Sequence, residues 1–188
     1  KVRTIAISYA VELLHASKGL DALKGELRQT WSAGIRLAAL SEVIAQQCTK
    51  LDTDSAFIAG LLNQIGVLYI FTKYDEYPDL LQDSEARQNL IDEWAAPIGE
   101  NIVANWDFSD EIQATLNPDL DERARRVTDP DLADVVTAAK ASLNGADDRL
   151  FDTPEARRLQ LNDQNMPTVM EQYEQKLMAV ASAVRPAA

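Results

Sequence analysis

Two neighbouring amide side chains, Asn63 and Gln64, are the only polar side chains inside the longest apolar run of this 188-residue chain, residues 56–70. Amide oxygens are neutral, so they bind divalent transition metals far less well than imidazole and carboxylate groups do. A buried amide that finds no partner costs about 1–3 kcal/mol. We therefore favour hydrogen bonds from this pair to each other or to neighbouring backbone, with a small-ligand pocket as the alternative.

The side chains most used for nucleophilic and metal chemistry are scarce, since histidine and cysteine occur once each, as His15 and Cys48. His15 falls at the end of a predicted helix, where a surface histidine is favourably placed against the helix dipole. Cys48 has no second histidine to activate it, and we expect its side chain to pack against the core. A single cysteine excludes an internal disulfide and suits the reducing cytoplasm. The sequence also lacks phosphate-binding glycine loops, zinc-ligand cysteine pairs and nucleophile elbows, so no cofactor is expected.

The overall charge limits the choice of partners. The chain has 18 lysines and arginines against 30 aspartates and glutamates, which gives a net charge of −12. An acidic surface repels phosphate backbones and anionic lipids, so nucleic acid and membranes are not expected as partners. The only basic stretch, residues 122–126, is flanked by aspartates and is predicted to be a solvated turn.

The element that holds the amide pair is predicted to be a helix, because alanine and leucine are abundant and strand-like alternation is nearly absent. Residues 56–70 are expected to form one central helix, which follows cap-forming residues at 52–55 and ends near residue 72. A core helix is favoured over a membrane span. Gly60 and Gly66 are expected to face a neighbouring helix, so Gly60→Val should overpack that contact and cost about 1–3 kcal/mol.

Apolar residues at three- and four-residue spacing predict further helices on both sides of the central one. They cover residues 2–16, 23–49, 110–116 and 166–184, with a short helix or irregular connection over 73–83 and a short helix over 153–161. Another helix starts at residue 84, carries Trp94 in its apolar stripe, and is predicted to kink or break near Ala95 because of Pro97. Residues 128–131 are predicted to cap and open a helix that stops at Asn144.

Residues 56–66 read A-F-I-A-G-L-L-N-Q-I-G. This segment resembles the central helix of HDOD domains, the HD-related output domains of bacterial signalling proteins, which reads like A-F-L-A-G-L-L-H-D-I-G-K-L. HDOD domains are a branch of the HD phosphohydrolase superfamily, in which the His-Asp pair binds a metal. Here Asn63 and Gln64 stand at the two positions of that pair.

Two further segments carry the resemblance. Trp31 matches the tryptophan of a motif like L-W-x-H-S, and the histidine position of that motif is Ala33 here. Residues 97–108 resemble a motif like H-A-E-I-G-x-x-L-L-x-x-W-G-F-P, with Gly99 and Trp106 at matching positions and Ala95 at the histidine position. The resemblance implies structural roles for Trp31, Gly60, Gly66, Gly99 and Trp106. It also implies that all four registered metal-ligand positions are substituted: Ala33, Asn63, Gln64 and Ala95.

The resemblance implies an all-α, compact multi-helix HD-like bundle. We expect residues 1–145 to form the HD-like domain, without the N-terminal half that the family usually has, and residues 146–188 to form a C-terminal extension with a loop and a final helix. The helical pattern begins directly at Lys1 and without a methionine, so a fragment of a longer protein is expected.

The function implied is that of a non-catalytic signal-transduction or scaffold module in the bacterial cytoplasm. Its expected partners are other signalling proteins or fused output domains, and its oligomeric state stays open. One alternative is a sensor that binds a small molecule, such as a nucleotide or cyclic dinucleotide, in the vestigial pocket. A diverged metal-dependent phosphohydrolase with different ligands is the remaining alternative.

Overall fold

The computed structural model describes residues 23–118, 129–145 and 148–183, and every regular element within these ranges is a helix. The all-α class is therefore confirmed. The elements are α2 (Lys24–Cys48), α3 (Thr53–Leu62), α4 (Ile65–Thr72), α5 (Pro78–Gln82), α6 (Ser84–Asn105), α7 (Asp110–Gln113), α9 (Leu132–Leu143), the 3-10 helix η2 (Asp148–Asp152), α10 (Pro154–Arg158) and α11 (Met166–Ala183). The predicted helix over residues 2–16 with His15, and the basic stretch 122–126, lie outside the described residues.

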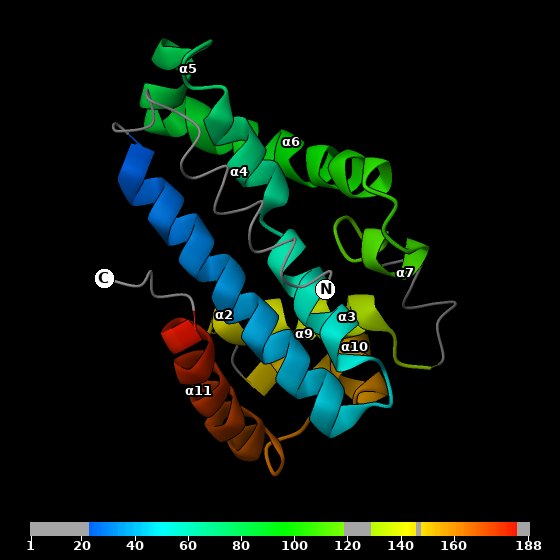
Figure 1. The fold of residues 1–188 in the computed structure, drawn as a ribbon. Coiled ribbons are helices and arrows are strands. Elements are labelled where there is room, and N and C mark those ends of the chain that lie inside the picture. Colours follow the sequence, from blue (N-terminus) through cyan, green and yellow to red (C-terminus); the bar gives the residue numbers. More distant parts are fainter. Residues whose placement is uncertain (1–22, 119–128, 146–147, 184–188) are drawn as a thin grey trace.

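The long helix α2 is the element on which the others assemble. Figure 1 shows it crossing the molecule, with α3 and α4 running along one side and α11 along another. Its C-terminal half is buried on nearly every face, from Leu37 to Ala45, because α3, α9 and α11 all pack against it. Cys48, at its end, is half-buried and packs against the main hydrophobic cluster, as predicted.

The apolar run predicted as one central helix is two helices, and this corrects the sequence-based expectation. α3 ends at Leu62 and α4 begins at Ile65, with Asn63 and Gln64 forming the turn between them. Gln64 has φ −99° and ψ 0°, a turn conformation rather than a helical one. The turn allows α3 to pack along α2 while α4 packs along α6, a division of partners that one straight helix would not permit.

By length and composition alone, the stretch Thr53–Thr72 that contains α3 and α4 is apolar enough to cross a membrane. Within the protein, however, 67% of its most apolar window is buried. Phe57, Ala59 and Leu62 are almost fully covered by the other helices. That burial is the property of a core helix, as the sequence predicted.

The helices cross most closely at two glycines. A Cβ built on Gly60 would lie 2.7 Å from the Ala38 Cα in α2, and a Cβ on Gly66 would lie 1.9 Å from the Ala95 carbonyl oxygen in α6. Real Cβ atoms do not approach backbone this closely, so only glycine fits. The prediction that both glycines face a neighbouring helix is confirmed.

Three details differ from the sequence-based predictions. α6 continues through Pro97 as one helix, so the predicted break near Ala95 is wrong, while the alternative of a kink stays a prediction. Pro97 has no N–H to donate to the Glu93 carbonyl, and Glu93 is an exposed residue. Trp94 is 48% exposed rather than buried in a stripe. The N-cap of α9 is Asp131, later than expected, because Asp131 and Asp134 form a reciprocal capping box.

The C-terminal segment packs on the same core as the rest of the described chain. Val169 and Tyr173 of α11 are buried in the cluster that α2, α3 and α9 form. Arg158 of α10 donates two hydrogen bonds of 2.7 Å to the Asp134 carboxylate in α9, and both side chains are nearly inaccessible. Helices on both sides of residue 145 share one hydrophobic cluster. The predicted division of the chain at this residue stays a prediction.

Candidate functional site

The two amides at the turn between α3 and α4 point to different surroundings. Asn63 donates a hydrogen bond of 3.0 Å from Nδ2 to the Thr115 carbonyl, just after α7. Gln64 makes no side-chain hydrogen bond with the residues that the structure describes, and its Cγ lies 3.5 Å from a Cβ built on Gly34 of α2. Asn63 thus follows the favoured interpretation, a bond to backbone, whereas Gln64 borders a pocket.

The Gln64 pocket has a volume of about 300 Å³ and is formed by three elements. α2 contributes one wall, the α3–α4 turn a second, and the C-terminal end of α9 with its capping residue the third. Its lining residues are Ala33, Arg36, Leu37, Gln64, Lys140, Leu143 and Asn144. Two cations and two amides therefore line it, with no carboxylate among the described lining residues.

The charges of the Gln64 pocket are not neutralised by the described part of the chain. Arg36 donates a 3.2 Å hydrogen bond from Nε to the Tyr173 hydroxyl, which is its one side-chain hydrogen bond to a described residue. Neither Arg36 nor Lys140 forms an ion pair with any residue in the described ranges. The Lys140 side chain reaches solvent, but surrounding protein atoms desolvate its ammonium enough to lower the pKa of this group.

The structure brings together two of the four predicted ligand positions, Ala33 and Gln64, as neighbours in this pocket. Asn63 is turned toward Thr115. Ala95 lies on α6 beside Gly66, within a separate cluster around Leu68 and Phe71. The positions that the family resemblance groups into one metal site are therefore split among different surroundings in this chain.

These residues do not fit a divalent metal. Ala33 and Ala95 carry no donor atom, and Asn63 and Gln64 each offer one neutral amide oxygen, with the Asn63 side chain turned toward the Thr115 carbonyl. Within residues 23–118, 129–145 and 148–183, no group of three or more histidine, cysteine, aspartate or glutamate side chains is arranged to hold a metal. No chemical step through a metal can be derived from these side chains.

The remaining family positions contribute to packing. Trp31 packs on the cluster of Ile35, Ala38, Phe57 and Leu61 between α2 and α3. Trp106 is half-buried against the main cluster, with its ring 6.4 Å from that of Phe108. A Cβ on Gly99 would lie 3.5 Å from Ile65 and Leu116 side chains, an ordinary contact, so this position is less restrictive than Gly60 or Gly66.

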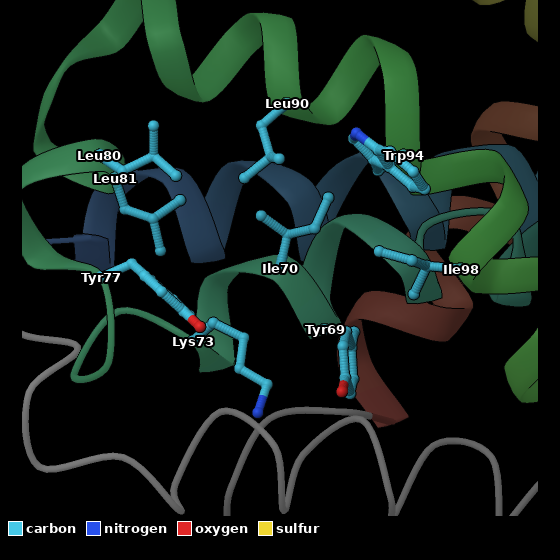
Figure 2. A pocket seen from close by; sticks show the side chains of 9 residues that line it. All are labelled: Tyr69, Ile70, Lys73, Tyr77, Leu80, Leu81, Leu90, Trp94 and Ile98. Atoms are coloured by element: carbon cyan, nitrogen blue, oxygen red, sulfur yellow. The ribbon is translucent and has the colours of Figure 1, made fainter.

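A second candidate site is an apolar groove of about 320 Å³ between α4, α5 and α6. Figure 2 shows the groove side chains of the three helices around a shared space. They are Tyr69, Ile70, Lys73, Tyr77, Leu80, Leu81, Leu90, Trp94 and Ile98. Tyr77, Leu80 and Trp94 are each at least 42% exposed, although they are large and apolar or aromatic. The Lys73 ammonium is paired with Glu76 at 2.7 Å, so its charge is largely balanced.

Neither cation of the Gln64 pocket was predicted from the sequence. Arg36 lies three residues after Ala33, so helical spacing placed both on one face of α2 and could have identified it. Lys140 had no such signal, because only the folding of α9 against α2 brings it near Gln64. The groove residue Tyr77 lies in the stretch 73–83, which was predicted as a short helix or irregular connection.

The described helices pack around α2, and a polar turn joins the buried helices α3 and α4. This arrangement is that of the HD-like helical class. The fold is similar to that of a solved structure of a proposed metal-dependent phosphohydrolase from Shewanella amazonensis SB2B, with a TM-score of 0.71 and 18% sequence identity. That similarity covers 94% of this chain and 68% of the other. The HDOD domain profile matches residues 1–118, more than half of the chain. The chain belongs to the HDOD family. No curated protein matches the sequence.

Proposed function

We propose that this chain is a non-catalytic signal-transduction or scaffold module that acts in the bacterial cytoplasm through contacts with other proteins. The observation that carries the proposal is the donor set at the four ligand positions of the family. Two of these positions are alanines, and the other two offer only the neutral amide oxygens of Asn63 and Gln64. A hydrolytic site of this superfamily needs imidazole and carboxylate ligands around an open coordination position.

The apolar groove supports a role in protein contact. Centres of protein interfaces are enriched in tyrosine and tryptophan and depleted in charge. Tyr77 and Trp94 combine these residue types with 57% and 48% exposure, and the ion pair between Lys73 and Glu76 leaves little net charge beside them. An amphipathic helix that inserts an apolar face between α5 and α6 is the partner segment that suits this groove.

Metal content and hydrolysis test the non-catalytic half of the proposal. The purified protein is expected to contain no stoichiometric iron, manganese or zinc and to leave a generic phosphodiester intact. The double variant Asn63→His with Gln64→Asp, which restores the family pair, is also expected to stay inactive, because Ala33 and Ala95 still supply no donors. Metal-dependent turnover by either protein would favour the diverged phosphohydrolase instead.

Complementation tests the protein-contact half. In the native host, a gene deletion should be complemented by the wild-type gene but not by Trp94→Glu, which places a charge in the groove. Met178→Glu is the matched control, since Met178 is 69% exposed on α11 and does not line the groove. Circular dichroism and melting temperature should show that both variants are folded. Full complementation by folded Trp94→Glu would remove the groove from the proposal.

A further inference from the structure

We propose that the pocket bordered by Arg36, Gln64 and Lys140 binds a small organic oxyanion, held by the two cationic side chains. This inference deepens the small-molecule alternative to the proposed function. It concerns the side chains that now occupy the pocket and requires no metal. The ligand class follows from three observations: unpaired positive charge, unused hydrogen-bond donors, and an apolar wall.

The positive charge is the first observation. The chain as a whole carries a net charge of −12, so two neighbouring cations without carboxylate partners stand out from its average surface. Ion pairs elsewhere in the described ranges neutralise partly covered cations, as in Arg158 with Asp134 and Lys176 with Glu42, whereas Arg36 and Lys140 are exposed. Arg36 and Lys140 have no such partner among the described residues. An oxyanion placed between them would supply the missing negative charge.

The geometry of the donors is the second observation. The Arg36 guanidinium is anchored by its Nε bond to Tyr173, which leaves its two terminal nitrogens available for a ligand. A pre-positioned guanidinium loses less side-chain entropy when it pairs with a phosphate or carboxylate. Gln64 adds an amide without a hydrogen-bond partner in the described ranges, and Asn144 adds a second amide to the lining. The C-terminal end of α9 contributes partial negative charge, which Lys140 in its last turn offsets.

The size and apolar wall of the pocket are the third observation. A volume of about 300 Å³ lies at the lower end of the range for small-molecule sites. Leu37, Leu143 and the methyl group of Ala33 form the apolar part of the lining. A ligand with one oxyanion and a compact apolar body would use both parts, with the oxyanion toward the cations. Contact of that body with the apolar wall would add hydrophobic stabilisation to the charged contacts.

Calorimetric titration with three matched probes tests the inference. Phenyl phosphate and benzoate share an apolar ring and differ in the oxyanion, and benzyl alcohol is a neutral analogue. At constant ionic strength, at least one anion should show saturable binding at least tenfold tighter than benzyl alcohol. Tighter binding of phenyl phosphate would assign a phosphate monoester as the ligand group, and tighter binding of benzoate would assign a carboxylate.

Variants identify the site of binding. Arg36→Gln and Lys140→Gln should each weaken anion binding at least tenfold, whereas Lys50→Gln should change it less than twofold. Lys50 is a matched control because it is exposed, loses the same charge and lines a different pocket. Absence of saturable anion binding to the wild-type protein, equal binding of benzyl alcohol, or equal weakening by Lys50→Gln would each overturn the inference. These outcomes are independent of metal content and of the Trp94→Glu phenotype, on which the proposed function depends.

Discussion

Gly66 and Gln64 are only two residues apart, yet their surroundings place opposite demands on them. Gly66 lies where α4 crosses α6 so closely that a Cβ would be 1.9 Å from the Ala95 carbonyl oxygen. Gln64 lies at a pocket of about 300 Å³, and its side-chain amide has no hydrogen-bond partner in the described ranges. The helix crossing restricts side-chain size, whereas the pocket leaves it free.

This difference separates the fold from the chemistry. The close helix crossings at Gly60 and Gly66 require glycine whatever the chain does, because backbone atoms of α2 and α6 occupy the space of a side chain. The side chains at 33 and 64 border a pocket, so their types can change without moving a helix. An HD-like bundle can therefore persist with alanine and glutamine at positions where a metal site would need donors.

The largest effect is expected for Gly66→Ala, which tests the close crossing of α4 and α6. The added Cβ would push against backbone rather than a flexible side chain, so the unfolding free energy should fall by about 3 kcal/mol or more. For a chain of this length that corresponds to a melting temperature lower by roughly 6–12 °C. Thermal unfolding followed by circular dichroism measures it.

Gly25→Ala is the control for Gly66→Ala. Gly25 lies in the first turn of α2, and a Cβ built there meets nothing within 4 Å. Since glycine is a poor helix former, this substitution should leave stability unchanged or raise it by about 0.5–1 kcal/mol. Equal losses for the two variants would show that backbone preference, and not close packing, decides the effect at Gly66.

The second prediction compares the two neighbouring amides. Asn63→Ala removes the bond to the Thr115 carbonyl and should lower the unfolding free energy by about 1 kcal/mol. Gln64→Ala removes a side chain without such a bond and should change it by less than about 0.5 kcal/mol. Urea unfolding of both variants with a common m-value measures the difference. A larger loss at Gln64 would mean that its amide is structural, which would weaken its assignment to a ligand pocket.

The sequence predicted those parts of the fold that depend on local pattern. Apolar spacing located α2, α6 and α11 and the buried side of α9, and two glycines in an apolar run indicated close helix crossings. The break between α3 and α4 was not predictable from that run, because it arises from the different neighbours of its two halves. Continuity of α6 through Pro97 was likewise not predictable from the sequence, because an interior proline can either kink a helix or end it.

The candidate site was predictable only at the positions that a family motif marks. Ala33 and Gln64 were identified as members of a vestigial site, and the structure places both at the pocket. Asn63 and Ala95 were predicted to belong to the same vestigial site, but neither lies at the pocket. The Asn63 side chain points toward Thr115, and Ala95 lies on α6 in a separate hydrophobic cluster. Lys140 reaches the pocket through tertiary packing of α9 on α2, for which a single sequence holds no local signal.

A further, smaller loss than that of Asn63→Ala is expected at the N-terminus of α3, which can be compared with the N-terminus of α4. Asp52 caps α3 by accepting a 2.7 Å hydrogen bond from the Ser55 N–H, whereas Gln64, the first residue before α4, makes no side-chain cap. Asp52→Ala should lower the unfolding free energy by about 0.5–1 kcal/mol at neutral pH. The effect stays small because the Asp52 carboxylate is exposed to solvent.

This last effect should depend on pH with a definite sign. The bonds from Ser55 lower the pKa of Asp52 in the folded chain, so folding favours its charged form. The stabilisation is therefore fully present above the pKa of the unfolded chain, about 4, and is lost as the pH falls through the lower folded value. Denaturant unfolding at neutral pH and at roughly pH 3 should show the difference between wild type and Asp52→Ala shrinking in acid. Asp52→Asn, whose neutral amide oxygen still caps the helix, should remain close to wild type and should not acquire that pH dependence. A wild-type advantage over Asp52→Ala that persists unchanged in acid would mean that the carboxylate charge contributes nothing, and that the uncharged capping hydrogen bond alone stabilises the start of α3.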